Sequence, residues 1–307
     1  APHPCVDCRL DVTFSHDDRS YTVPGYYAAD GLAADTSAAS GNKWRVHFTP
    51  DETGLWTYAV SFRTGSGVAV SDNPSAGTAA DLDGTAGSFV VAPTDKKGRD
   101  HRGKGMLRYV NARYLKFAGS GEPFVKGGTS GPENFLAYSG FDQTLPSHSY
   151  APHAGDWHQE DPSWRGTQGR TIIGALNYAA RTGLNAVSML TVNVASQGAD
   201  VWPWTGRDVR DRFDCSKLDQ WDMVFAHMDK LGLLLHLELQ APGSNAVFDG
   251  GELGDERKLY YREMVARFGH HLALVWDIGL PDAEMDVQRQ SFAAYLRGID
   301  PYHHPIV

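Results

Sequence analysis

Cysteine is scarce in this chain, which has only Cys5, Cys8 and Cys215 among its 307 residues. Cys5 and Cys8 form a Cys-Val-Asp-Cys motif near the N-terminus. A zinc site would need a second Cys/His pair at ligand spacing, and a redox thiol would need an adjacent helix start. The sequence offers neither, so the motif predicts a local disulfide or two inert thiols.

Long apolar runs and excess positive charge are also missing. No segment approaches the roughly 18 consecutive apolar residues of a membrane span. Lys and Arg number 28 against 37 Asp and Glu, which gives a formal net charge of -9. Because phosphate backbones are bound by clustered cations, nucleic acid is excluded as an expected partner. We expect a soluble chain without a membrane span.

Histidine pairs at helical ligand spacing beside an acid are missing as well. A metal-dependent enzyme built on His148, His153 or His236 therefore has little support. We expect neither a metal nor a cofactor. The chain begins at Ala1 rather than Met, which fits removal of a signal peptide, so we expect a secreted, extracellular protein.

The first part of the chain has the alternation of β-strands. Large apolar and polar residues alternate in residues 43–48 and 56–62, and a similar texture covers 9–14 and 87–92. Short strands at this spacing predict an antiparallel β-sandwich over residues 1–93. The charged, glycine-rich residues 94–105 are predicted to be a solvated linker.

From residue 106 to 307 the texture changes to apolar strands that alternate with amphipathic helices. Strict alternation specifies a parallel sheet with crossover helices. Strands are expected at 124–127, 185–192, 233–239 and 272–278, followed by helices near 171–182, 216–231, 256–268 and 287–298. We expect Ser216 to cap the second helix.

A fifth strand begins at Pro305, where the chain ends, whereas a (β/α)8 barrel needs eight strands. The fold class is therefore multidomain, a β-sandwich followed by an incomplete (β/α)8 barrel. Either the half-barrel is open, or the rest of a longer polypeptide or a partner chain completes it.

Functional residues of parallel α/β folds lie where strands end. In the third strand, His236, Glu238 and Gln240 alternate with leucines along the chain. Alternate side chains of a strand face opposite sides of the sheet, and the outer helices should cover the leucines. The three polar side chains should therefore point into the barrel. A hydrogen-bonded polar core layer explains this set equally well. Asp277 ends the fourth strand, and Glu133 follows the first.

Loop residues near the strand ends mix aromatic rings with polar groups, as a sugar site requires. Packing of long loops over the barrel mouth is the alternative explanation. The substrate-binding candidates are Asn134, His153, Asp156, Trp157, Asn193, Trp202, Trp204, His236, Gln240 and Asn245.

Several segments resemble one family of bacterial-type glycoside-hydrolase-like proteins. Its members carry an immunoglobulin-like domain ahead of a barrel of the large retaining-glycosidase clan. The resemblance implies this same architecture here, over nearly the whole chain. It rests on residues 48–58, 127–135, 216–221, 256–263, 266–270 and 300–307.

The chain departs from that family at two loops. The family pattern continues the fourth strand with two glutamates, where this chain has Leu280 and Pro281. After the third strand, Ala241-Pro242-Gly243 stands where the family carries acids. Glycosidic hydrolysis normally takes two carboxyl groups, so a key carboxylate is expected to be lost.

Two functions follow from these observations. The first is a glycoside-hydrolase-like protein that acts on or binds an extracellular polysaccharide or oligosaccharide, with Glu238, Asp277 and Glu133 as the catalytic candidates. The second is a catalytically silent scaffold that keeps the fold for carbohydrate binding or for assembly of an extracellular structure.

Overall fold

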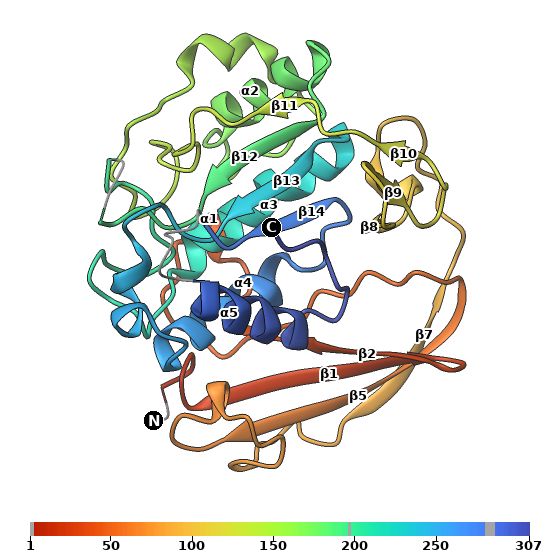
Figure 1. Cartoon of the computed structure of the whole chain (residues 1–307), viewed down its shortest axis with the longest axis vertical. Coiled ribbons are helices and arrows are strands. Elements are labelled where there is room, and N and C mark those ends of the chain that lie inside the picture. Colours follow the sequence, from red (N-terminus) through yellow and green to blue (C-terminus); the bar gives the residue numbers. More distant parts are fainter. Residues whose placement is uncertain (1–2, 196–197, 280–285) are drawn as a thin grey trace.

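The computed structural model describes residues 3–195, 198–279 and 286–307. Its N-terminal part is built from antiparallel sheets, and its later part is a parallel sheet with helices (Figure 1). The predicted switch of sheet type along the chain is confirmed.

The N-terminal part contains one five-stranded and one two-stranded antiparallel sheet. In the larger sheet β2 (Arg19–Pro24) pairs with β1 (Cys8–His16), which pairs with β5 (Gly54–Thr64). Both β6 (Thr78–Ala79) and β7 (Ala86–Val91) pair with β5. The smaller sheet joins β3 (Tyr26–Tyr27) to β4 (Trp44–Arg45). Short helices α1 (Ala33–Thr36) and η1 (Val68–Val70) lie between strands.

The strand expected at residues 43–48 is confined to β4. After it, the ring of Phe48 stacks on Phe14 with centroids 4.1 Å apart, and Thr49 N donates to Tyr302 Oη at 2.9 Å. The residues after β4 therefore contact the face of the five-stranded sheet and the α/β part, and they do not continue the hydrogen-bonded pair of β3 and β4.

One face of the five-stranded sheet forms a core with the α/β part. Leu10, Val12 and Phe14 alternate along β1 and pack with Trp56, and Leu272 and Tyr302 of the α/β part join the same cluster. Leu55 and Val90 on the strands are exposed. The sheet therefore buries one face and leaves part of its other face in solvent.

The cysteines of the N-terminal motif are free thiols. Burial raises the pKa of Cys5 to about 12, and it also raises the pKa of Cys8. A thiol with a raised pKa is a poor nucleophile at neutral pH. Of the two alternatives for this motif, the inert thiols are the one observed.

The later part of the segment expected to be a solvated linker is instead docked on the α/β part. Arg99 donates to the carbonyl oxygens of Leu231 and Ala180 at 3.0 and 2.9 Å. Asp100 and His101 are buried, and η2 (His101–Gly103) follows. Residues 94, 95, 97 and 98 are exposed, so the solvated-linker prediction was wrong only for the later part of the segment, where Arg99 donates to helix-end carbonyls.

A small antiparallel sheet closes one end of the parallel sheet. It consists of β8 (Leu107–Tyr109), β9 (Leu115–Phe117) and β10 (Pro123–Phe124). Its residues Leu107, Phe117 and Phe124 form a core cluster with Ala186 and Leu234 at the start of two parallel strands.

The first parallel strand begins later than predicted. Residues 124–127 were expected to form it, but Phe124 pairs antiparallel with Leu115, and β11 is Gly128–Thr129. A Cβ atom on Gly128 would lie 2.1 Å from the carbonyl oxygen of Ala186, so only glycine allows this close entry.

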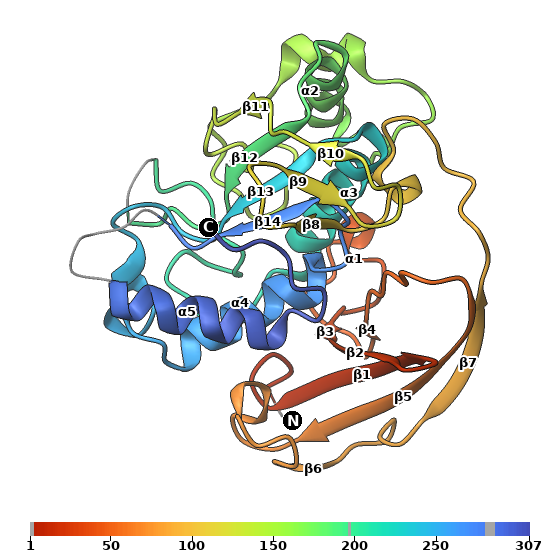
Figure 2. The ribbon, with the colours of Figure 1, turned by 45° about the vertical axis from the view of Figure 1, so that its right-hand side comes forward.

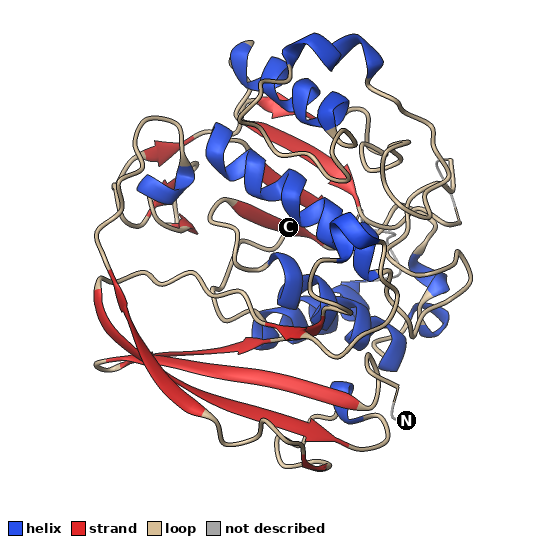
Figure 3. Cartoon of the chain, turned by 180° about the vertical axis from the view of Figure 1, so that it is seen from behind, coloured by secondary structure: helices blue, strands red, loops and turns tan. Residues whose placement is uncertain are grey.

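The parallel sheet has the order β11, β12 (Ala186–Leu190), β13 (Leu234–Glu238), β14 (Leu274–Asp277). Its helices are α2 (Arg170–Arg181), α3 (Cys215–Leu231), α4 (Asp255–Phe268) and α5 (Asp286–Ile299), close to the predicted ranges. Seen from behind, α3 covers the sheet (Figure 3). Further short helices are η3 (Ala151–Asp156), η4 (Asn245–Val247) and η5 (Asp249–Gly251).

The ends of α3 and the last residues refine the sequence predictions. Asp214, rather than Ser216, caps α3, because its side chain accepts from Lys217 N; Gly232 ends the helix with φ 70°.

Trp276 of β14 forms a parallel bridge with Ile306, where the fifth strand was expected. No helix within the described residues is long and apolar enough to cross a membrane.

Candidate functional site

Glu238 and Asp277 lie side by side at the carboxyl ends of β13 and β14. They are paired in register, and ligand atoms of His236, Glu238 and Asp277 all lie within 4.8 Å of one another. Leu235 and Leu237 are fully buried against the helices, whereas His236 and Glu238 are half-buried on the other face. This is the side-chain alternation that the sequence predicts for β13.

A lysine, a histidine and an aspartate are connected across the sheet. Lys126 Nζ lies 2.9 Å from His236 Nδ1 and 3.0 Å from Ser188 Oγ, and His236 Nε2 lies 2.8 Å from Asp277 Oδ2. An ammonium group can only donate, so Nδ1 is the acceptor and the Nε2–H group donates to Asp277. The arrangement fixes the tautomer and the orientation of the imidazole.

The two carboxyl groups are held in different electrostatic environments. Burial raises the pKa of Glu238, and the nearby carboxylates of Asp277 and Glu133 add to this effect. Burial also acts to raise the pKa of Asp277, but the hydrogen bonds from His236 and Gly279 N outweigh it and lower that pKa. Neighbouring carboxyl groups with separated pKa values can serve as a proton donor and an ionised partner.

Glu133 lies at the same edge of the sheet. Its carbonyl oxygen accepts from Leu190 N at 2.8 Å, which ties its loop to the end of β12. Its side chain is exposed, and its charge contributes to the raised pKa of Glu238. The three acids proposed from the sequence are therefore brought together.

A metal at this group of three side chains would have to replace hydrogen bonds that are already made. His236 would have to offer a ring nitrogen, but Nδ1 faces the Lys126 ammonium and Nε2 is bonded to Asp277. A cation at this place would compete with Lys126 for the same carboxylates. The arrangement favours proton transfer over metal binding.

Asn134 and Asn193 hold a loop instead of lining the cleft. Asn193 is fully buried, and its amide donates to Asp200 Oδ1 at 2.7 Å. Asn134 donates to Asp200 Oδ2 at 2.8 Å and contacts His148 Nε2 at 2.8 Å. The predicted convergence of Asn193 with the acids is not found, because Asp200 draws both amides into one buried network.

His153, Asp156 and Trp157 lie outside the sheet, against α2. His153 Nδ1 contacts Asp156 Oδ2 at 3.1 Å, and the guanidinium of Arg170 lies 4.3 Å from the Trp157 ring centroid. Their expected position near the strand ends was wrong. Gly174 makes the packing feasible, since a Cβ there would lie 2.1 Å from the carbonyl oxygen of His153.

The remaining candidates form the packed base of the loops that follow β12 and β13. Trp204 is fully buried against Phe248 and Tyr260, and Trp202 lies beneath Lys217, whose Nζ is 5.0 Å from the ring centroid. The buried Arg257 donates to Gln240 Oε1 and Asn245 Oδ1 at 2.6 and 2.8 Å. These four residues support the loops.

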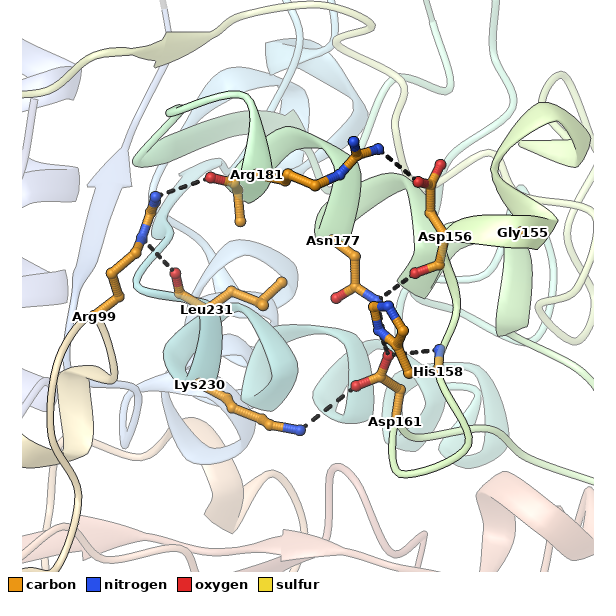
Figure 4. A pocket seen from close by; sticks show the side chains of 10 residues that line it. Arg99, Gly155, Asp156, His158, Asp161, Asn177, Arg181, Lys230 and Leu231 are labelled. Atoms are coloured by element: carbon orange, nitrogen blue, oxygen red, sulfur yellow. Dashed lines mark hydrogen bonds and ion pairs between the residues drawn. The ribbon is translucent and has the colours of Figure 1, made fainter.

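Two cavities lie at different places on the α/β part. One of about 830 Å³ is lined by Lys126, His236, Val275 and Arg297, among others, and so shares Lys126 and His236 with the site. Figure 4 shows another of about 630 Å³, beside the C-terminal ends of α2 and α3.

The cavity of Figure 4 is far from the carboxyl ends of the strands, and its charges are already paired. Arg181 bonds Asp156 at 2.8 Å, and Lys230 lies 3.5 Å from Asp161. Each of these cations would have to give up its present partner to bind a ligand. The cavity lined by Lys126 and His236 is therefore the better candidate site.

Two further features bear on catalysis. Leu280 and Pro281, the positions where the resemblance led us to expect two glutamates, lie outside the described residues. Lys126 and Ser188 belong to the site, although the sequence analysis did not name them. Lys126 could have been noticed in the sequence, because it is a single cation between an apolar hairpin strand and the first parallel strand.

Comparisons with known proteins bear mainly on the fold. A domain of unknown function (DUF5060) matches residues 1–63, and no curated protein matches the chain. A putative glycoside hydrolase from Bacteroides vulgatus superposes with a TM-score of 0.68 at 17% identity. The match covers 99% of this chain and 52% of that structure, so the chain spans about half its length.

A glycoside hydrolase family 5 structure from the same species gives a TM-score of 0.40 at 18% identity. That match covers 66% of this chain and 38% of the other. The comparison at 0.68 establishes a glycoside-hydrolase-like fold for this chain.

Proposed function

We propose that this chain is part of a secreted glycoside-hydrolase-like protein that acts on an extracellular polysaccharide or oligosaccharide. The supporting observation is the pairing of Glu238 with Asp277 at the carboxyl ends of neighbouring parallel strands. Retaining glycosidases hold their two carboxyl groups about 5 to 5.5 Å apart. Burial raises the pKa of Glu238, as suits a proton donor.

The proposed architecture has three parts. Residues 1–93 form an immunoglobulin-like β-sandwich, and residues 106–307 form the first units of a (β/α)8 barrel. Residues 94–105 connect these two domains. The remainder of a longer polypeptide or a partner chain would complete the barrel and supply a further carboxylate. Loss of the family acids at Leu280 and Pro281, and at residues 241–243, supports the alternative of a silent carbohydrate-binding scaffold.

The test is a paired screen of hydrolysis and binding across extracellular polysaccharides, carried out on the intact protein. If Glu238 is the proton donor, Glu238→Gln lowers turnover by about 10²- to 10⁴-fold and leaves binding of the same sugar nearly unchanged. Glu160→Gln, which changes an exposed acid, should keep full turnover.

Each outcome separates the two functions. Binding without turnover in the unmodified protein supports the scaffold, and a Leu280→Glu variant that then gains turnover locates the lost acid. Turnover that survives Glu238→Gln contradicts the assigned role of Glu238. Absence of both binding and turnover contradicts both functions.

A further inference from the structure

A cluster of histidines and an aspartate lies where the N-terminal part meets the helices. His47 follows β4, Asp222 belongs to α3, and His270 and His271 follow α4. Figure 2 shows the β3–β4 ribbon between the large antiparallel sheet and these helices. His270 and His271 lie before the amino end of β14, whereas Asp277 of the candidate site ends that strand.

Three of these side chains could hold one ion. Ligand atoms of His47, Asp222 and His270 lie within 4.8 Å of one another. His47 Nδ1 faces His270 Nδ1 at 3.3 Å, and Asp222 Oδ2 lies 4.0 Å from His47 Nδ1. Zinc bonds of 2.0–2.1 Å in a tetrahedron place neighbouring ligand atoms about 3.3–3.4 Å apart. The histidine pair already has this spacing, and Asp222 Oδ2 is about 0.6 Å too far from His47 Nδ1 for it.

The groups around the cluster orient its ligands. Tyr26 Oη lies 3.1 Å from His47 Nε2, so Nδ1 is the nitrogen left facing the cluster. His271 Nδ1 pairs with Asp229 Oδ2 at 2.8 Å, while its Nε2 lies 3.3 Å from Asp222 Oδ1. Metal-binding side chains are typically held in this way by outer hydrogen bonds and carboxylates.

The cluster is enclosed yet reachable from solvent. The side chains of His47, Asp222 and His270 are 20%, 24% and 20% exposed. Asp222 Oδ1 is buried and lies 3.3 Å from His271 Nε2 and 3.8 Å from His270 Nε2.

We propose that His47, Asp222 and His270 bind a divalent transition-metal ion of the zinc class, with water completing the coordination. Two imidazoles and one carboxylate match the ligand preference of zinc. The ion would join residue 47 to α3 and to the end of α4. Its role is structural, because it connects the antiparallel part of the chain to the α/β part.

The experiment is calorimetric titration of zinc into the chelator-treated intact protein. One ion should bind per chain, and His47→Gln or His270→Gln should weaken binding by more than about 100-fold. Tyr26→Phe removes only an outer hydrogen bond and should weaken it by about 10-fold. His158→Gln, which changes an exposed histidine, should bind as the unmodified protein does.

Thermal unfolding gives an independent readout that also reports folding. Zinc should raise the Tm of the unmodified protein by a few degrees and that of folded His47→Gln by much less. Unchanged affinity in both His47→Gln and His270→Gln, or no zinc binding at all, overturns the proposal. Loss of zinc binding in His236→Gln but not in His47→Gln would place the ion at the candidate site and also overturn it.

Discussion

Lys126 brings a positive charge to the candidate site. Its ammonium donates to His236 and Ser188, and its charge acts to lower the pKa of Asp277 and opposes the rise that burial causes in the pKa of Glu238. Burial lowers the pKa of Lys126, while the two carboxylates act in the opposite direction. The cation and the acids therefore stabilise each other's charged forms.

Replacing Lys126 with methionine should raise the pKa of Glu238 further, because a nearby positive charge that favours the carboxylate is lost. The change can be followed by carbon NMR titration of the labelled glutamate side chains. Lys97→Met, at an exposed position of the connecting segment, should leave the Glu238 titration unchanged. An unaltered or lowered pKa in Lys126→Met would show that Lys126 has no electrostatic role.

Among the elements, the turn after α5 positions the last residues of the chain against β14. Buried Asp300 accepts from Tyr302 N and His304 N at 3.0 and 2.9 Å, and from Trp276 Nε1 at 3.1 Å. Trp276 in turn exchanges backbone hydrogen bonds with residues 305 and 307. One carboxylate thus organises both the turn and the bridge to Ile306.

Asp300→Asn should reduce stability at pH 7 by about 2–3 kcal/mol. Burial opposes the effect, but the charge of His304 and the hydrogen bonds to the carboxylate lower the pKa of Asp300 to about 2. Because its folded pKa lies below the unfolded value of about 3.9, the stabilisation is present above pH 4 and is lost as pH falls toward 2.

Urea unfolding at pH 7 and at about pH 2.5 checks this sign. The difference between Asp300→Asn and the unmodified protein should shrink at the lower pH. Asp17→Asn, at a side chain 87% exposed, serves as the control. An equal loss at both pH values would mean that the ionised form of Asp300 is not the stabilising one.

At the scale of the whole molecule, the antiparallel and α/β parts share a core. Trp56, Leu10 and Phe62 of the sheet pack in one cluster with Leu272 and Tyr302. Thr49 Oγ1 donates to the carbonyl oxygen of His270, and Arg262 bonds Asp11 at 2.7 Å. Contacts of this kind couple the unfolding of the two parts.

Trp56→Ala should cost about 3–5 kcal/mol, because a fully buried indole is lost. Since the cluster is shared, circular dichroism of the helices and hydrogen exchange of β13 amides should report the same loss. The neighbouring Leu55→Ala, at an exposed position, should change stability by less than about 0.5 kcal/mol. Helices that unfold at an unchanged denaturant concentration in Trp56→Ala would show that the two parts unfold separately.

The sequence by itself determined the four long helices, the parallel strands β12 to β14 and the direction of side chains along β13. These follow from periodicity of two or 3.6 residues, which is local and independent of distant contacts. The sequence also indicated Glu238 and Asp277, since register in a parallel sheet places adjacent strand ends together.

Only the tertiary structure decided where the long loops pack and which distant side chains meet. Residues 153–157 pack on α2, Asp200 gathers Asn134 and Asn193, and Lys126 reaches His236 across the sheet. His47 and His270 are 223 positions apart yet lie 3.3 Å from each other. No local pattern encodes such contacts, because they depend on the packing of whole elements and on the few buried polar groups that must find partners.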